Sequence, residues 1–223
     1  MAQPEVPPRH ALPPSAILPT GRFAGRLRYD TLVDGRARIL PTWLLTTADR
    51  QVAASIVTLL GGRLPVATGD DQKSGYHVLT DDAEIDVLLD GPQAIRLRML
   101  RRHGATVLRC CNGRTQRTPS GKQPCQCPPT LKGRWQAAKA GHGCEPLVHV
   151  TFRLAADPTL GRFLLSSATW AFADHAMTVK TALRKRGGAV RARLRIDRSL
   201  HTTTSGTTFA YTRPTITILP TVP

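Results

Sequence analysis

All five cysteines of this 223-residue chain lie between residues 110 and 144, in a segment that offers little else from which to build a fold. Residues 104–147 are rich in glycine, proline and basic side chains, and they show one short helical pattern, from Lys132 to Ala140. A segment of this kind cannot bury enough apolar surface to fold alone, so it needs a covalent or metal cross-link. The cysteines therefore restrict the chain to folds that carry a cross-linked insert.

Two kinds of cross-link can use these cysteines. Two disulfides would suit an exported chain, but the cysteine count is odd and the proline-rich N-terminus has no secretory-signal pattern. We therefore predict one structural Zn²⁺ per chain, closed by four thiolates. The predicted ligands are Cys111, Cys125, Cys127 and Cys144.

The ligand choice leaves two alternatives open. The spacing contains a Cys-x-Cys pair, Cys125 and Cys127, rather than the commoner Cys-x-x-Cys. Cys110 is expected to be a small buried residue, because two adjacent cysteines are hard to place on one tetrahedron with so short a pair. His142 is the alternative fourth ligand, and in its glycine-flanked turn we expect it to be exposed.

The charge is divided unevenly along the chain. Residues 1–90 carry 9 Lys/Arg against 11 Asp/Glu, whereas residues 91–223 carry 22 against 4. A net of −2 is thus followed by a net of +18, which favours binding of a polyanion or an acidic protein face. Basic side chains near the cysteines are also expected to offset the charge of the zinc thiolates.

Hydrophobic periodicity predicts an α+β fold, a single mixed domain with antiparallel strands and two main helices. The helices are expected from Thr47 to Gly61 and from Ala168 to Arg186. Strands are expected at 84–89 and 95–99, joined as a β-hairpin through Asp90-Gly91, and at 148–154, 163–165, 190–196 and 207–218. The domain spans 21–218, includes the zinc-stabilised module 104–147, and follows a proline-rich flexible tail, 1–20.

Two basic groups are candidate contacts for a partner or for phosphate. Arg184, Lys185 and Arg186 close the second helix, and Arg191, Arg193 and Arg195 share one face of a strand. The alternative interpretation is that both are ordinary solvated faces. Trp170 and Phe172 are interpreted as core residues rather than as partner anchors, because their spacing is helical.

An enzyme is the minor hypothesis, in the form of a small metal-dependent hydrolase. Four cysteines close the metal shell, residues 91–223 hold only four scattered carboxylates, and no phosphate-loop or nucleophile motif is present. No run approaches the roughly 18 apolar residues of a membrane span, so we expect a cytoplasmic protein without a membrane partner or small-molecule substrate.

Seven short motifs occur in a fixed order. They are Gly21-Arg22 with Gly25-Arg26, Leu59-Leu60-Gly61-Gly62, Cys111-Asn112-Gly113, Pro124-Cys125-Gln126-Cys127-Pro128, Gly143-Cys144-Glu145-Pro146, Leu160-Gly161 with Ser166 to Trp170, and Arg186-Gly187 with Ala192 to Ile196. In this order, over about 21–218, the chain resembles the recombination directionality factors that actinobacterial phages and integrative elements use with large serine integrases.

The resemblance implies a non-enzymatic protein of the bacterial cytoplasm that binds a serine integrase near the coiled-coil part of its C-terminal region. Such a factor turns integration of attP with attB into excision of attL with attR, and direct contact with the att-site DNA is a further expectation. The resemblance also implies that the matching cysteines form a zinc site. The second hypothesis is a basic zinc-containing DNA-binding regulator of a mobile element.

Overall fold

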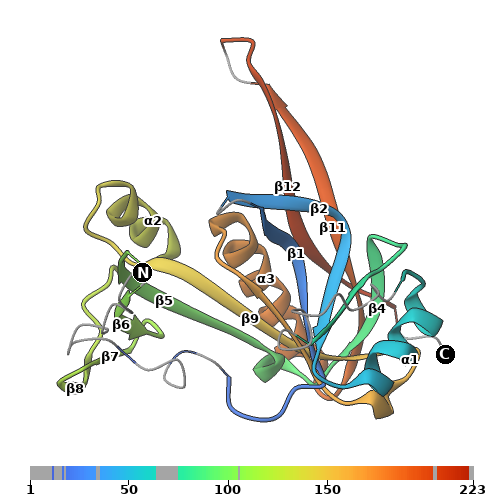
Figure 1. The fold of residues 1–223 in the computed structure, drawn as a ribbon. Coiled ribbons are helices and arrows are strands. Elements are labelled where there is room, and N and C mark those ends of the chain that lie inside the picture. Colours follow the sequence, from blue (N-terminus) through green and yellow to red (C-terminus); the bar gives the residue numbers. More distant parts are fainter. Residues whose placement is uncertain are drawn as a thin grey trace, which may run out of the picture.

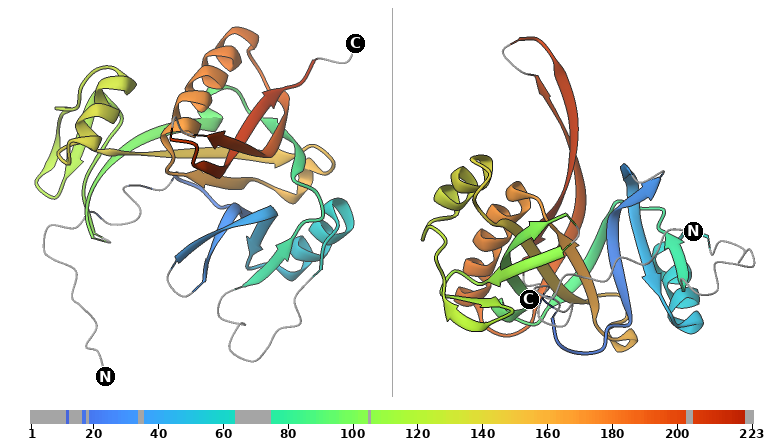
Figure 2. Two further views of the ribbon diagram at one scale, coloured as in Figure 1. Left: turned by 90° about the horizontal axis from the view of Figure 1, so that it is seen from above. Right: turned by 60° about the vertical axis from the view of Figure 1, so that its left-hand side comes forward.

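A ten-residue strand, β9 (Glu145–Leu154), organises the main sheet, because strands pair with both of its edges. The computed structural model describes residues 12, 17, 19–33, 36–63, 75–104, 106–202 and 205–220. Within them the chain forms a mixed α+β domain with a large sheet in which the strand pairs are antiparallel apart from one (Figures 1 and 2). The predicted fold class is therefore confirmed.

The predicted hairpin of 84–89 with 95–99 is wrong, although both segments are strands. β4 (Glu84–Leu89) and β5 (Ile95–His103) do not pair with each other but follow one another along the same edge of β9. A short 3₁₀ helix, η3 (Pro92–Ala94), separates them. Gly91 has an extended ψ of −168°, so Asp90-Gly91 does not reverse the chain as a tight hairpin turn requires.

The sheet extends from β9 in both directions. On one side lie β10 (Phe163–Ser167), its parallel neighbour β1 (Gly25–Val33), then β2 (Arg36–Thr47) and β3 (Tyr76–Leu79). On the other side β5 is followed by β6 (Thr106–Cys111), β7 (Thr115–Thr118) and β8 (Gly121–Pro124). The cysteine-bearing segment thus continues the main sheet, and it contains three short strands that the periodicity did not predict.

The helices lie where the apolar stripes predicted them. α1 (Arg50–Leu60) is capped by the carboxylate of Asp49, which accepts from the amides of Gln51 and Val52. α3 (Trp170–Arg186) begins at the Thr169 cap and buries Phe172, Ala173, Ala176, Val179 and Leu183. It packs against β5, β9 and β12. The shorter α2 (Leu131–Lys139) crosses the far end of the sheet, and η4 (Pro158–Leu160) joins β9 to β10.

The last two strands form a long hairpin whose far end leaves the body of the molecule. β11 (Val190–Thr202) pairs with β12 (Thr208–Ile218) from Ala192 to Thr202, and from Val190 to Arg195 it also pairs with β4. At the base Ile196 and Ile216 are buried, and the Ile216 amide donates to Nε2 of His175 on α3 (2.9 Å). Figures 1 and 2 show the remainder projecting as an arm.

One hydrophobic core joins α1, α3 and the sheet. Trp43 is fully buried in it, and its indole Nε1 donates to the carbonyl of Ala83 (2.9 Å), which ties β2 to the start of β4. Among the residues that the structure describes, no helix is long and apolar enough to cross a membrane.

Most of the predicted flexible tail, 1–20, lies outside the described residues. Two of its residues that are described, Leu12 and Ile17, pack against a small cluster formed by Leu100, Val107 and Cys110. The Leu12 amide also donates to the carbonyl of Val107 (2.9 Å).

Candidate metal centre

Three separate pieces of chain bring four cysteines together at the end of the main sheet. Cys111 ends β6, Cys125 and Cys127 follow β8, and Cys144 immediately precedes β9. Cys111 and Cys144 are buried, while Cys125 and Cys127 are half-buried. Met99 and the partly buried Trp170 pack against the cluster, so α3 and β5 reach it from the core.

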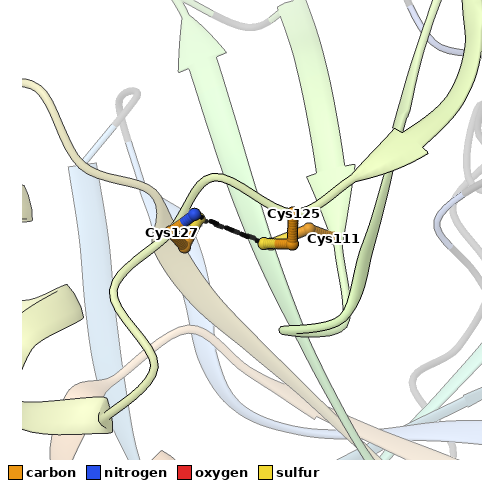
Figure 3. Close-up of side chains that lie close together, drawn as sticks. All are labelled: Cys111, Cys125 and Cys127. Atoms are coloured by element: carbon orange, nitrogen blue, oxygen red, sulfur yellow. Dashed lines mark hydrogen bonds between the residues drawn. The ribbon is translucent and has the colours of Figure 1, made fainter.

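The sulfur positions suit a shared ligand. The Sγ atoms of Cys111, Cys125 and Cys127 all lie within 4.8 Å of one another (Figure 3). Cys127 Sγ lies 3.5 Å from that of Cys111 and 3.6 Å from that of Cys144. Tetrahedral zinc with Zn–S bonds of about 2.3 Å spaces its sulfurs at about 3.8 Å, whereas a disulfide needs about 2.05 Å. Cys111, Cys125 and Cys127 can therefore hold a metal ion, and the Cys144 sulfur lies beside that of Cys127. Thiolate sulfur is a donor that zinc favours.

Cys144 is placed by the tight return of the chain after α2. The amides of His142 and Gly143 both donate to the carbonyl of Ala137. From the neighbouring strand, Arg101 donates from Nη1 to the carbonyls of Gly141 (3.0 Å) and Gly143 (2.8 Å). No sequence signal indicated this role of Arg101, because Arg101 lies about forty residues before the loop that it holds.

Arg109 faces the sulfurs directly. Its Nη2 donates to Cys144 Sγ (3.5 Å) and its Nη1 to Gln126 Oε1 (3.4 Å). A hydrogen bond from the Cys111 thiol, supported by the Arg109 guanidinium, lowers the pKa of Cys144 to about 5. Burial raises the pKa of Cys127 to about 11. The lowered pKa of Cys144 favours its thiolate, which is the form that binds a metal.

A second arginine fixes the loop that carries Cys125 and Cys127. Arg134 on α2 is buried, and it donates from Nε to the carbonyl of Pro128 (2.7 Å) and from Nη2 to that of Pro129 (3.3 Å). After Cys111 the carboxamide oxygen of Asn112 accepts from the amides of Arg114 and Thr115, which turns the chain. Two of the basic residues near the cysteines therefore support the cluster. Arg109 contacts a sulfur directly, and Arg134 holds the loop that follows Cys127.

The two alternative ligands lie elsewhere. Cys110 is buried in the separate cluster with Leu100 and Val107, because neighbouring residues of a strand point to opposite faces. His142 is exposed, and its Nδ1 lies 3.4 Å from the carbonyl of Ala140.

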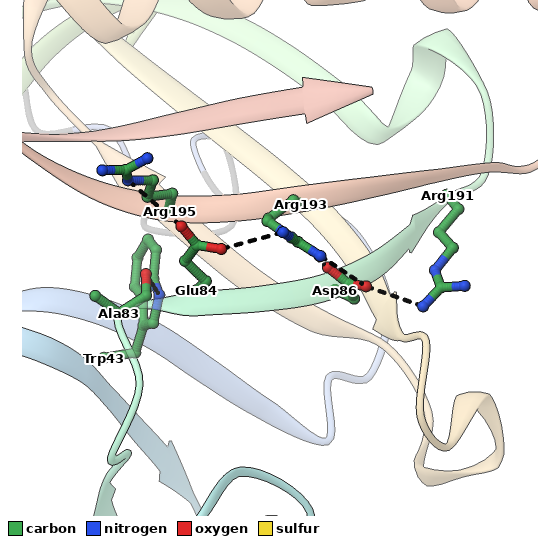
Figure 4. A network of polar contacts seen from close by, with 7 residues as sticks. All are labelled: Trp43, Ala83, Glu84, Asp86, Arg191, Arg193 and Arg195. Carbon is green, nitrogen blue, oxygen red and sulfur yellow. Dashed lines mark hydrogen bonds and ion pairs between the residues drawn. The ribbon is translucent and has the colours of Figure 1, made fainter. Parts of the chain in front are cut away.

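The basic face of β11 carries ion pairs with β4. Arg193 contacts Asp86 (2.7 Å) and Glu84 (3.2 Å), while Arg191 contacts Asp86 (2.9 Å) and Arg195 contacts Glu84 (3.6 Å) (Figure 4). Hydrogen bonding from Arg193 holds the pKa of Asp86 below its usual range. The sequence did not predict these acidic partners, because strand pairing across about a hundred residues leaves no local signal.

The other predicted basic group, at the end of α3, is exposed. Arg186 donates to the carbonyl of Leu219 (3.0 Å), whereas Arg184 and Lys185 form no ion pair with any residue that the structure describes. The two predicted basic groups therefore differ. The arginines of β11 form ion pairs with Glu84 and Asp86, whereas the basic end of α3 is exposed to solvent.

The fold and the cysteine cluster together define a class, that of mixed α+β proteins with a site able to hold a metal ion. A protein-family model described as Gp3-like, recombination directionality factor-like, matches residues 21–217. The chain therefore belongs to the recombination directionality factor-like family, whose members are regulatory factors rather than catalysts and whose role implies interaction with a recombinase. No solved structure matches the chain.

Proposed function

We propose that this protein is a recombination directionality factor that binds a large serine integrase and switches it from attP × attB integration to attL × attR excision. The observation that carries the proposal is the family match over 21–217, which takes in α1, α2, α3 and every strand of the described residues except the last residue of β12. The proposed partner surface is the coiled-coil region in the C-terminal part of the integrase. The proposed setting is the cytoplasm of the bacterial host, and no catalytic role is proposed.

The switch is proposed to act as a shift between two integrase–DNA arrangements. A bound factor can favour one arrangement only through the difference between its binding free energies for the two. A change from about 1:99 to 99:1 requires a difference of roughly 5.5 kcal/mol. A rigid factor suits this task, because a flexible one would adapt to both arrangements and lose the difference.

We further propose that Cys111, Cys125, Cys127 and Cys144 hold one structural Zn²⁺. The proposal is supported by the 3.5 and 3.6 Å sulfur separations and by the contact of Arg109 with Cys144. The ion would join the end of β6, the loop after β8 and the start of β9. Arg109 offsets part of the negative charge of the thiolates, and Arg101 and Arg134 hold the two loops in place.

An excision assay tests the proposed function. Purified integrase from the same genetic element is mixed with attL and attR DNA, with and without this protein, and binding is measured in parallel by pull-down after nuclease treatment. We expect DNA-independent binding and excision that depends on the factor. Excision that is unchanged by the factor would overturn the proposal. Tight, salt-dependent DNA binding in that case would support the second candidate, a basic zinc-containing DNA-binding regulator.

A further inference from the structure

A basic groove lies between the cysteine module and α3. It has a volume of about 510 Å³ and is formed by Arg96 to Arg98 of β5, which precede the residues that pair with β6, and by the turn after β6, α2 and α3. None of the lining residues that the structure describes is acidic. The basic side chains that line it are Arg96, Arg98, Arg114, Arg134, Lys180 and Arg184.

Most of these charges are not neutralised within the described part of the chain. Arg96, Arg98, Arg114 and Arg184 form no ion pair there, in contrast to the arginines of β11. Arg134 is engaged by two carbonyls, and Lys180 donates to the carbonyl of Ile95 (2.8 Å). Six basic residues therefore line one groove, and four of them have no ion-pair partner among the described residues.

The electrostatics of Lys180 agree with this geometry. Its pKa is lowered by partial burial and by repulsion from Arg184, Arg96 and Arg98. A bound anion would relieve this repulsion, since opposite charge nearby favours the protonated form of a lysine.

The density and type of the charges identify the ligand. Duplex DNA carries one negative charge per about 1.7 Å of helix axis, whereas an extended acidic peptide carries at most one carboxylate per about 3.3 Å. Arginine forks bind both carboxylate and phosphate oxygens, so the choice between the two rests on the spacing of the charges and on the ability of phosphate oxygens to accept from several directions at once. Arginines that converge from separate elements therefore match a phosphate backbone better than an acidic segment of protein.

We propose that the basic groove binds the sugar-phosphate backbone of DNA, without reading its sequence. The identity of that DNA, the att-site DNA held by the integrase, rests on the proposed function, but the phosphate chemistry does not. The groove would add a second contact between the factor and the recombination complex. It would also supply a salt-sensitive part of the binding energy.

The test compares two variants of the full-length, zinc-loaded protein that have the same net charge. Arg96→Gln/Arg184→Gln removes two exposed, unpaired cations of the groove, and Arg191→Gln/Arg195→Gln removes two paired cations of β11. Binding to a labelled random-sequence duplex of about 30 base pairs is followed by fluorescence anisotropy between about 50 and 200 mM NaCl. Thermal unfolding verifies that both variants are folded, and Lys180→Gln provides an independent third variant.

We expect the groove variant to bind DNA about tenfold more weakly and to lower the slope of log K against log salt by about 1.8, since each phosphate contact contributes about 0.9. The control should change the affinity by less than about twofold. Equal weakening by both variants, or no binding of wild-type protein at the lowest salt, overturns the inference.

Nuclease-treated pull-down separates the other outcomes. Loss of integrase binding by the groove variant in the absence of DNA would assign the groove to an acidic protein surface and overturn the inference. A wild-type protein that binds DNA yet leaves excision unchanged would overturn the proposed function but not the groove. If excision depends on the factor although the factor does not bind DNA, the groove inference is overturned and the proposed function stands.

Discussion

At the scale of single residues, arginines act as structural parts of the cysteine module. Arg101 holds the carbonyls of Gly141 and Gly143, Arg134 holds those that follow Cys127, and Arg109 contacts the sulfur of Cys144. These side chains are largely engaged inside the module. Part of the positive charge of residues 91–223 is thus internally compensated, and the net charge overstates the field that a partner meets.

Replacing one sulfur should remove the metal. We expect Cys125→Ser to bind far less than one zinc per chain and to expose the amides of residues 106–144 to hydrogen exchange, because a serine hydroxyl is a poor zinc ligand. Structural zinc contributes about 10–16 kcal/mol in isolated fingers, so its loss should melt this module. Metal analysis and exchange mass spectrometry check the prediction.

Cys110→Ala is the matched control for that substitution. Cys110 is as buried as Cys111 but belongs to the separate cluster with Leu100 and Val107. We expect it to lose about 1 kcal/mol of packing while keeping its zinc. The contradicting result would be a Cys125→Ser protein that, even with a chelator present, is as stable to unfolding as the untreated wild-type protein. Such a result would exclude a structural role for the metal.

His149 is a buried base surrounded by cations. Burial, with repulsion from Arg98, Arg26 and Arg96, lowers its pKa to about 4, and its Nε2 has no hydrogen-bond partner among the described residues. The unfolded chain, with a histidine pKa of about 6.5, binds more protons than the folded one between these values. The contribution of neutral, buried His149 to the free energy of unfolding is therefore complete above pH 6.5 and is lost as the pH falls toward 4.

Urea unfolding at several pH values should reveal this histidine. We expect His149→Gln to lack a pH-dependent loss of unfolding free energy that amounts to about 3 kcal/mol in the wild type over this window. His142→Gln, which alters an exposed ring, should keep the wild-type dependence. Parallel curves for wild type and His149→Gln would show that His149 is protonated in the folded state as readily as in the unfolded chain.

At the scale of elements, local patterns predicted helices better than strand partners. The stripe of Phe172, Ala176, Val179 and Leu183 determines α3, because residues at this spacing share one helix face. The alternation in 84–89 correctly predicted a strand, but pairing depends on which edge is free, and the edge of β9 accepts both β4 and β5. Nothing within those twenty residues encodes that choice.

The same contrast between local and long-range features applies to the candidate site and the basic groove. Cysteines that are clustered in sequence were predicted as a unit, and the structure brings Cys111, Cys125 and Cys127 within 4.8 Å of one another. The basic groove was not predicted, because its residues are spread from Arg96 to Arg184 and converge only through the packing of α3 on the sheet. Sequence spacing identifies local ligands, whereas charge convergence requires the fold.

The connection from α2 to β9 provides a test at this scale. A Cβ at Gly143 would lie 2.3 Å from the Ala138 amide nitrogen, so Gly143→Ala must push the chain, and Cys144 with it, away from α2. We expect a marked fall in bound zinc and in melting temperature. At Gly141 a Cβ meets nothing within 4 Å, although φ is +80°. Gly141→Ala should therefore lose only about 1 kcal/mol and keep the metal. Metal analysis of both proteins decides, and equal zinc contents would contradict the expectation.

At the scale of the whole molecule, the core and the arm formed by β11 and β12 contribute differently to stability. Among the side chains that the structure describes, the buried ones of β11 and β12 end at the pair Ile196 and Pro214, yet the strands continue pairing from Arg198 with Thr212 to Thr202 with Thr208. A two-stranded ribbon is only marginally stable in water, so this extension adds little to the stability of the domain. We therefore expect the arm to matter for function rather than for the stability of the domain.

Shortening the arm should therefore separate stability from function. Arg198 and Thr212 lie opposite each other, so residues 199–211 can be replaced by Asn-Gly, which closes a two-residue hairpin turn. We expect the shortened protein to keep its zinc and to melt within about 2 °C of wild type, because less than about 1 kcal/mol is lost. Excision of attL × attR, however, should fall strongly. A large drop in melting temperature would show that the arm supports the core, and full excision activity would show that the integrase is bound by other surfaces. Asp86→Asn is the companion variant. It removes the ion pairs that join β11 to β4 below the arm, so we expect it to lower the melting temperature while the arm stays in place.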